Sequence, residues 1–118
     1  MHKVVEIVNN PVLLASDKGD KLYRHLKKAL GAKPFKEITL DFEGYKFLSS
    51  TFLNHAFGQL CIDLKISEKQ FFNKIKFVNL DEDDLDEVTL CVLNAQMRIG
   101  IIKKGHDEKK FYASIAEY

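Results

Sequence analysis

Apolar residues recur at two spacings along the chain, and each spacing predicts one kind of element. Residues 4–8 and 12–14 are short runs rich in branched apolar side chains, and residues 35–42 alternate apolar with polar positions toward their end. Together with the short apolar run at residues 75–78, these segments predict β-strands. Residues 9–11, Asn-Asn-Pro, are a turn signal, so we expect the first two strands to form a hairpin.

Other segments carry apolar residues at helical spacing. The first predicted helix covers residues 16–30 and ends at Gly31, which would supply a left-handed stop. A second follows the hydroxyl cluster at residues 49–51 and buries an unbroken apolar stripe as far as residue 64. Residues 67–70, Ser-Glu-Lys-Gln, have the form of a capping box and predict a brief extra turn.

The last long helix is predicted over residues 80–98. It begins with the acidic run at residues 81–84, which opposes the positive end of the helix dipole, and Gly100 follows its end. Its apolar residues cover more than one face, so it is either deeply packed or in contact with a partner. Residues 99–104 and 110–115 flank a polar turn and predict a closing hairpin.

This order of strands and helices, with short connections, predicts an α/β fold. A chain of 118 residues has the length of one domain, so we expect a single domain over residues 1–118. No apolar run approaches the roughly 18 residues that cross a bilayer, and the first residues lack an apolar leader. We therefore expect a cytoplasmic protein without a membrane partner.

Charge and chemistry-bearing residues narrow the function classes. Eighteen basic and seventeen acidic residues leave a formal charge of +1, which does not favour nucleic-acid binding. Cys61 and Cys91 lie in helical patterns without metal-ligand spacing, which predicts buried, reduced thiols. The chain lacks the GxSxG, HExxH, Walker A and GxGxxG patterns, and its four histidines are scattered. We predict no catalytic residue, no metal site and no cofactor.

The hydroxyl cluster Ser49, Ser50 and Thr51 is the segment that bears most directly on function. One of its hydroxyls is expected to cap the following helix, which stabilises a helix by about 1 kcal/mol. Backbone N–H groups and the helix dipole at such a position also favour an anion or a phosphoryl group. The cluster therefore predicts either a plain helix cap or a phosphorylation site at Ser50 or Thr51.

Residues 40–53, Leu-Asp-Phe-Glu-Gly-Tyr-Lys-Phe-Leu-Ser-Ser-Thr-Phe-Leu, resemble STAS domains, the fold of bacterial anti-sigma-factor antagonists. Those domains carry a strand of the form LDLSGVxFIDSSGL that runs into a helix. Leu40-Asp41 matches the end of that strand, and Phe47-Leu48 matches the two apolar residues before the serines. Ser50 then falls on the serine that a partner kinase phosphorylates in the antagonists.

Two positions differ from the antagonists, because Ser49 replaces the usual acid and Phe52 replaces the usual glycine. The chain is more similar to STAS-like bacterial domains of unknown function, whose pattern resembles LDFxGVxFISxSFLDEAxGxL. Residues 52–60 and 75–80 fit that family as well, so the resemblance covers roughly residues 12–98.

The resemblance implies one four- to five-stranded mixed sheet with helices mainly on one face. It also implies a non-enzymatic regulator that acts through protein contact, with a kinase-like ATPase or another regulator as partner; a homo-oligomer is left open. An alternative is a module that holds a small anion or nucleotide at the helix start after Ser50. The expected contact residues lie around this corner: Glu43, Lys46, Ser49, Ser50, Thr51, Asn54 and His55.

Overall fold

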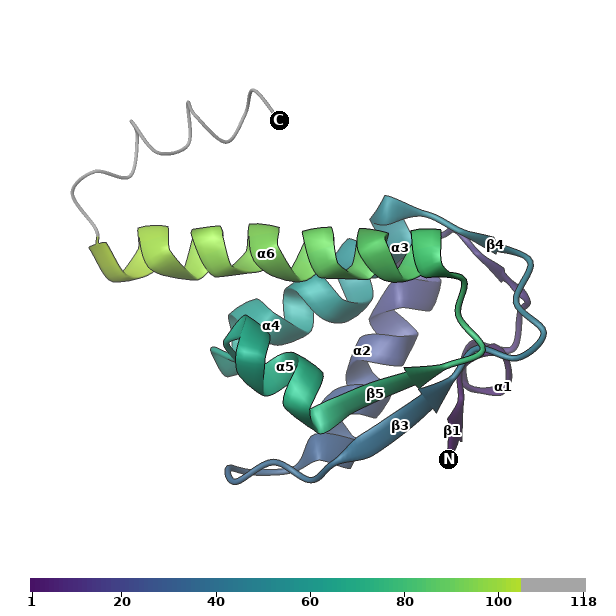
Figure 1. Cartoon of the computed structure of the whole chain (residues 1–118), viewed down its shortest axis with the longest axis horizontal. Helices are drawn as coiled ribbons and strands as arrows, with labels where there is room; N and C mark the ends of the chain where they lie inside the picture. Colours follow the sequence, from purple (N-terminus) through teal and green to yellow (C-terminus); the bar gives the residue numbers. More distant parts are fainter. Residues whose placement is uncertain (105–118) are drawn as a thin grey trace.

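The computed structural model describes residues 1–104, and it gives residues 101–104 by their backbone alone. Three parallel strands form one sheet: β1 (His2–Lys3), β3 (Ile38–Asp41) and β5 (Ile75–Val78), in the spatial order β1-β3-β5. Figure 1 shows β3 and β5 side by side. The two longer strands lie where the sequence pattern predicts them, although β3 is shorter than the predicted segment.

The middle strand β3 is buried because it is flanked on both sides. Leu40 lies opposite His2 of β1 and opposite Phe77 of β5, and Ile38 lies opposite Ile75. Ile38 and Leu40 are both buried, as expected for a parallel strand covered by helices. Its last residue, Asp41, is the one charged side chain that is buried among the described residues.

The other two strands, β2 (Val12–Leu13) and β4 (Phe47–Leu48), form a separate parallel pair. The expectation of a single four- to five-stranded mixed sheet is therefore wrong: the described residues form a three-stranded and a two-stranded sheet, both parallel. The chain turns away from β3 at Gly44, whose φ of 87° suits glycine. After this turn the chain enters β4, which pairs with β2 and not with a strand of the three-stranded sheet.

Residues 4–8 form a helical turn, α1 (Val4–Val8), where the sequence predicts a strand. Val4 and Val8, four residues apart, are both buried, so burial against the fold overrides the β-propensity of valine. Asn9 ends the turn in the left-handed conformation, and its N–H donates to the Glu6 carbonyl. The predicted hairpin between residues 4–8 and 12–14 is consequently absent.

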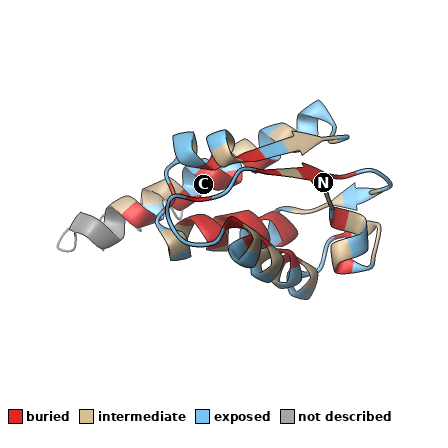
Figure 2. Cartoon of the chain, turned by 90° about the horizontal axis from the view of Figure 1, so that it is seen from below, coloured by how far each residue is buried: buried red, intermediate tan, exposed pale blue. Residues whose placement is uncertain are grey.

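The first long helix, α2 (Ser16–Leu30), matches its predicted range. Leu22, Leu26 and Leu30 are fully buried along one face. Gly31 ends the helix with a φ of 72°, although its ψ of −155° places it outside the left-handed helical region that was expected. Figures 1 and 2 show α2 on the same side of β3 and β5 as the helix that follows β4.

That following helix has three parts: α3 (Ser50–Leu53), the π-helix η1 (Asn54–Gly58) and α4 (Gln59–Leu64). The predicted apolar stripe is buried from Leu53 through Cys61. The sequence predicts a regular helix here, and the π-helical turn in its middle was not foreseen. Such turns are rare in proteins and are frequently found at functional sites.

A short helix, α5 (Glu68–Lys74), begins with the predicted capping box, in which the Ser67 and Gln70 side chains each bond the other's backbone N–H. Its Phe71 packs in an aromatic cluster with residues of η1 and β5. The ring centroids of Phe57 and Phe71 are 5.6 Å apart, and those of Phe57 and Phe77 are also 5.6 Å apart. The cluster joins the helical layer to the sheet.

The last helix, α6 (Glu82–Lys104), is longer than predicted and passes through Gly100. Residues 99–104 are therefore helical, where the first strand of a closing hairpin was expected. The second half of that hairpin, within residues 105–118, lies outside the described residues. None of the helices in residues 1–104 combines the length and the apolar character needed to cross a membrane.

Candidate functional site

Ser49 is the residue of the hydroxyl cluster that caps the helix. Its Oγ accepts a hydrogen bond from Phe52 N at 3.0 Å and donates to the Leu14 carbonyl at 2.8 Å. Its own N–H donates to the Leu13 carbonyl at 3.0 Å. Ser49 therefore fixes the helix start to the end of β2, which leaves the neighbouring hydroxyls without this structural role.

Replacing Ser49 with alanine should lower the free energy of unfolding by about 1 kcal/mol, because the Phe52 N–H loses its cap. Ser50→Ala is the matched control, since it removes an exposed hydroxyl one residue along and should change stability by less than about 0.5 kcal/mol. Urea unfolding of the two variants measures both effects. Equal stability of the two variants would contradict the assignment of the cap.

Ser50 and Thr51 are exposed at the beginning of α3. Beside Ser50 lies a small cavity of about 60 Å³ between α3, η1 and α6, lined also by Glu87, Leu90 and Asn94. At its inner wall, the Cys91 thiol lies 3.4 Å from the Leu53 carbonyl oxygen. The hydroxyl most similar to the antagonist phosphoserine is thus accessible and lies close to α6.

Three exposed apolar side chains lie near this hydroxyl in the chain or line the cavity beside it. Phe47, three residues before Ser50, is 61% exposed, and Leu14, whose carbonyl Ser49 contacts, is 44% exposed. Leu90 of α6 lines the small cavity with Ser50 and is 53% exposed. We call these residues the Ser50 surface: Leu14, Phe47, Ser50, Thr51 and Leu90. Exposed aromatic and leucine side chains are the residue types that supply apolar area in protein contacts.

Glu43 and Lys46 lie at a different place from Ser50. They line a polar hollow of about 490 Å³ at the carboxyl ends of β3 and β5, together with Asn79 and Asp81. The neighbouring Asp41 carboxylate accepts from the Asn79 amide at 2.8 Å and from the Glu43 N–H at 2.9 Å. These two bonds, that from Asn79 first, hold the pKa of Asp41 below its usual range.

Tyr45 connects this hollow to the start of α6. Its hydroxyl donates to Asp84 at 2.6 Å and accepts from the Asp81 N–H at 3.1 Å. Partial burial, with the hydrogen bond to Asp84 next in importance, raises the pKa of Tyr45 to about 12. The tyrosine is therefore a neutral structural link at physiological pH.

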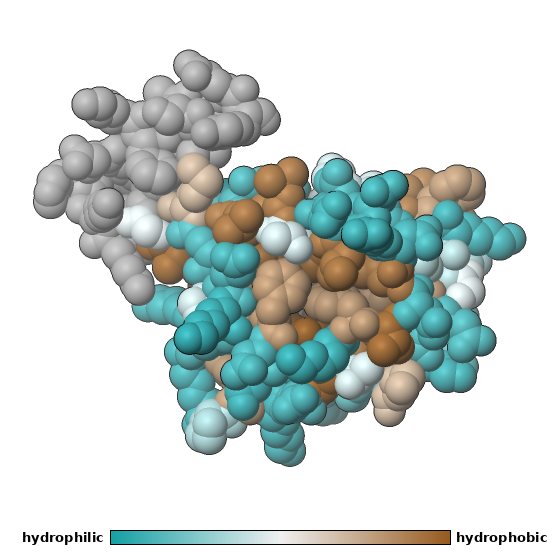
Figure 3. Space-filling view, viewed as in Figure 1, coloured by the Kyte–Doolittle hydropathy of each residue, from teal (hydrophilic) through white to brown (hydrophobic). Residues whose placement is uncertain are grey.

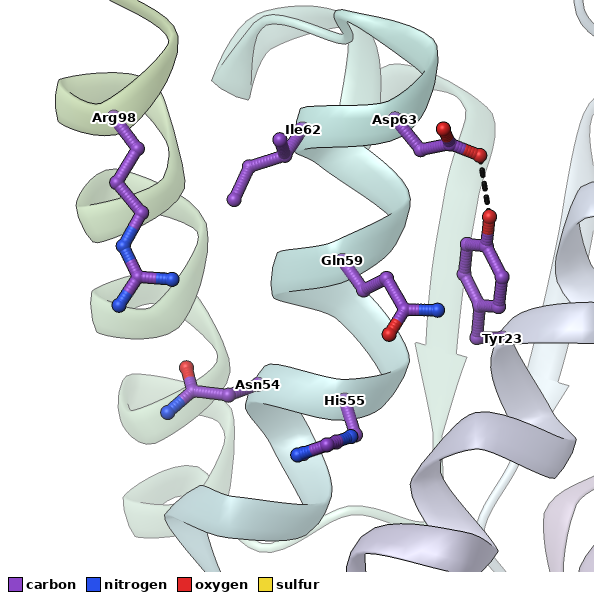
Figure 4. A pocket seen from close by; sticks show the side chains of 7 residues that line it. All are labelled: Tyr23, Asn54, His55, Gln59, Ile62, Asp63 and Arg98. Carbon is purple, nitrogen blue, oxygen red and sulfur yellow. Dashed lines mark hydrogen bonds between the residues drawn. The ribbon is translucent and has the colours of Figure 1, made fainter. Parts of the chain in front are cut away.

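Asn54 and His55, the last two predicted contact residues, line the largest cleft of the described structure. This cleft has a volume of about 510 Å³ and lies between α2, the η1–α4 helix and α6. Figure 4 shows its lining side chains: Tyr23, Asn54, His55, Gln59, Ile62, Asp63 and Arg98. The expected contact residues are thus divided among three places, and only Asn54 lines both this cleft and the cavity beside Ser50.

Two acidic groups at the cleft are already paired. The Asp63 carboxylate accepts from the Tyr23 hydroxyl and from the Lys27 ammonium, the latter at 2.8 Å. Lys27 first, and Tyr23 next, hold the pKa of Asp63 below its usual range. On the other side, Asp20 of α2 lies 2.9 Å from His55 Nδ1. Among residues 1–100, neither the Lys27–Asp63 ion pair nor the His55–Asp20 contact includes Arg98.

Sequence reasoning missed most of this cleft. Gln59, Ile62 and Asp63 follow Asn54 and His55 at helical spacing, so they lie on one side of the helix outside its apolar stripe. That spacing was the available signal, but a polar helix face is usually solvated. Tyr23 and Arg98 come from α2 and α6, which no local pattern connects to residues 54–63.

The thiols of Cys61 and Cys91 are buried and unpaired, as predicted, and burial raises their pKa values to about 12 and about 11.

Figure 3 shows an apolar area in the middle of the molecule's face, where a groove of about 370 Å³ runs between α6 and the α5–β5 segment. Phe72, Phe77 and Leu85 line this groove, with few polar groups to select a ligand.

The helix start at Ser49–Thr51, the parallel strands before and after it, and the long final helix agree with one known family. The family model described as a STAS-like domain of unknown function (DUF4325) matches residues 18–85, more than half of the chain. The chain belongs to this family. No curated protein and no solved structure matches it.

The family membership confirms the resemblance that residues 40–53 indicate and bears on function in general terms. STAS-like domains are generally non-enzymatic, and the family suggests a regulatory role like that of anti-sigma-factor antagonists.

Proposed function

We propose that this STAS-like domain is a regulatory module that binds a protein partner through the Ser50 surface, with Ser50 as a phosphorylation site. The observation that carries the proposal is that Ser49, and not Ser50, caps the helix. Ser49 holds the structural cap, so the exposed Ser50 hydroxyl can be modified without loss of that cap. Exposed Phe47 and Leu90 beside it supply apolar contact area for a partner.

The fold of this chain accounts for the two departures from the antagonist pattern. Ser49, which replaces the acid, is the helix cap, and Phe52, which replaces the glycine, is fully buried in the core. Both changes serve the fold of this chain and leave Ser50 accessible. A kinase-like ATPase would therefore meet a hydroxyl presented at a helix start, as in the antagonists.

The surroundings of Ser50 indicate what a phosphoryl group would do. It would add nearly two negative charges at the first residue of α3, where the helix dipole is favourable. Glu87 of α6 lines the same small cavity, so the new charge would also repel this carboxylate. The modified side chain is thus expected to point outward and to change the surface that a partner contacts.

The proposal is tested with a kinase-like ATPase from the same genome. The chain is incubated with this enzyme and ATP, and intact-mass spectrometry measures phosphoryl addition to the natural chain, to Ser50→Ala and to Thr51→Ala. We expect addition to the natural chain and to Thr51→Ala, and none to Ser50→Ala. Affinity for the same enzyme should fall about tenfold or more in Ser50→Asp, which places a charge on the contact surface.

Asn73→Asp is the matched control, because it adds the same charge at an exposed position of α5 outside the Ser50 surface. A similar loss of affinity in both aspartate variants would indicate general repulsion rather than a specific position. Absence of phosphoryl addition together with unchanged affinity of Ser50→Asp would refute the proposal.

The alternative, a nucleotide or small anion held at the helix start after Ser50, has less support. The cavity there measures about 60 Å³, which accommodates a few water molecules but not a nucleotide. Partner contact therefore remains the function that this corner supports best.

A further inference from the structure

We propose that the cleft between α2, η1–α4 and α6 binds a small organic oxyanion, that is, a metabolite carrying a phosphate or carboxylate group, with Arg98 as its main anchor. This site is distinct from the Ser50 surface and does not depend on the proposed partner. Its volume of about 510 Å³ lies within the range of small-molecule sites in proteins.

The anionic group is expected at Arg98. Guanidinium groups bind carboxylates and phosphates through paired, charge-assisted hydrogen bonds. Figure 4 shows the Arg98 side chain extending from α6 toward Asn54 of η1, so the charge lies within the cleft. Among residues 1–100, whose side chains the structure describes, no carboxylate lies within ion-pair distance of this guanidinium.

Neutral side chains at the cleft supply further polar contacts. Asn54 Oδ1 lies 3.2 Å from the Cys91 thiol, so the amide nitrogen is left to donate elsewhere. Gln59 lies one helical turn further along and brings a second amide to the same space. His55 Nδ1 is held by Asp20, and its Nε2 is the ring nitrogen that a ligand can use.

Both carboxylates that could oppose an anion, Asp63 and Asp20, are paired, and Asp20 contacts His55 Nδ1. Asp63 belongs to the cleft lining, but its charge is directed to the Tyr23 hydroxyl and the Lys27 ammonium. Figure 4 shows Ile62 on the side of α4 that faces Arg98, and the Tyr23 ring on the other side, next to Asp63. An anionic group at Arg98 and a ring or short carbon chain against Ile62 would therefore match neighbouring parts of the lining.

The test uses the full chain and three probes: inorganic phosphate, adenosine monophosphate and citrate. Titrations followed by calorimetry and by the amide NMR signals of Asn54, His55 and Gln59 measure affinity and position. We expect at least one probe to bind and to shift these signals. Arg98→Gln should weaken that binding about tenfold or more, since a charge-assisted contact is lost. A preference for the nucleotide or for citrate identifies the phosphate or the carboxylate class.

Arg24→Gln is the matched control, because it removes an exposed arginine of α2 that does not line the cleft. It should leave binding unchanged, and Gln59→Ala should weaken it without altering the fold. Failure of all three probes to shift the cleft signals overturns the proposal, as does an equal loss of affinity in Arg24→Gln and Arg98→Gln. Ser50→Asp should still bind the probe, so this experiment and the phosphorylation experiment can fail independently.

Discussion

Replacing Gly19 with alanine is expected to destabilise the protein by about 3 kcal/mol, the upper end of the usual cost of overpacking. Gly19 is buried in α2 where this helix crosses the helix that follows β4. A Cβ atom at this position would lie 2.5 Å from the Phe52 carbonyl oxygen and 2.7 Å from the His55 Cβ. The first of these is backbone, so relief requires that α2 and the α3–η1 segment move apart.

Gly100→Ala provides the control for this experiment. Gly100 lies inside α6, and a Cβ atom there meets no atom of the described residues within 4 Å. Alanine should therefore stabilise the helix by about 0.5–1 kcal/mol through its higher helix propensity. Urea unfolding of both variants gives the comparison. A Gly19→Ala variant as stable as the natural chain would show that the two helices are not packed as closely as described.

The close contact at Gly19 also sets the geometry of the cleft. Asp20 follows Gly19 directly and holds His55, which places one wall of the cleft against α2. A shift of α2 away from η1 would separate this pair and widen the space opposite Arg98. Gly19→Ala is therefore expected to weaken binding of an anion as well as to lower stability.

Much of the fold could be predicted because local pattern and burial agree. In α2 the three leucines four residues apart are buried as their spacing predicts, and the Ser67–Gln70 capping box begins a helix as its residue types indicate. The pattern was misleading at residues 4–8, where branched residues indicate a strand but the one-turn spacing of Val4 and Val8 suits a buried helical turn. Short apolar runs do not distinguish these two outcomes.

The arrangement of the strands could not be obtained from the same information. β2 and β4 are two residues long and pair with each other across more than thirty residues of chain. Such pairing depends on where the Gly44 turn directs the chain, and apolar spacing does not encode that direction. The family resemblance supplied the α/β class but not the division into two sheets.

The hydroxyl cluster could be predicted because one segment contains all three of its residues. The cleft could not be predicted, because its lining comes from three separate elements. The hydroxyl cluster was identified from sequence, although only the contacts to Phe52 and Leu14 assign the cap to Ser49. The cleft draws residues from α2, η1–α4 and α6, and its polar side chains resemble an ordinary solvated helix face. The π-helical turn that carries Asn54 and His55 has no signal in the apolar pattern either.

The largest loss of stability is expected for Phe57→Ala, at about 3–5 kcal/mol. Phe57 is fully buried in η1 and its ring packs edge to face on Phe71 of α5 and Phe77 of β5. Removing this ring leaves a cavity where the π-helical turn, the short helix and the sheet meet. Since domains of this size unfold with about 5–15 kcal/mol, the variant should be largely destabilised, which urea unfolding would measure directly.

Phe47→Ala removes a phenylalanine ring from β4 instead of η1. It tests the effect of this ring on partner binding without a large change in core packing. Phe47 is 61% exposed on β4, so stability should change by less than about 0.5 kcal/mol. Its ring belongs to the Ser50 surface, however, and its loss should weaken binding of the kinase-like ATPase by about tenfold or more, as for an aromatic contact residue. Unchanged affinity in a stable Phe47→Ala variant would remove the apolar part of this surface from the proposed contact. A stability loss as large as that of Phe57→Ala would instead mean that β4 packs against the core.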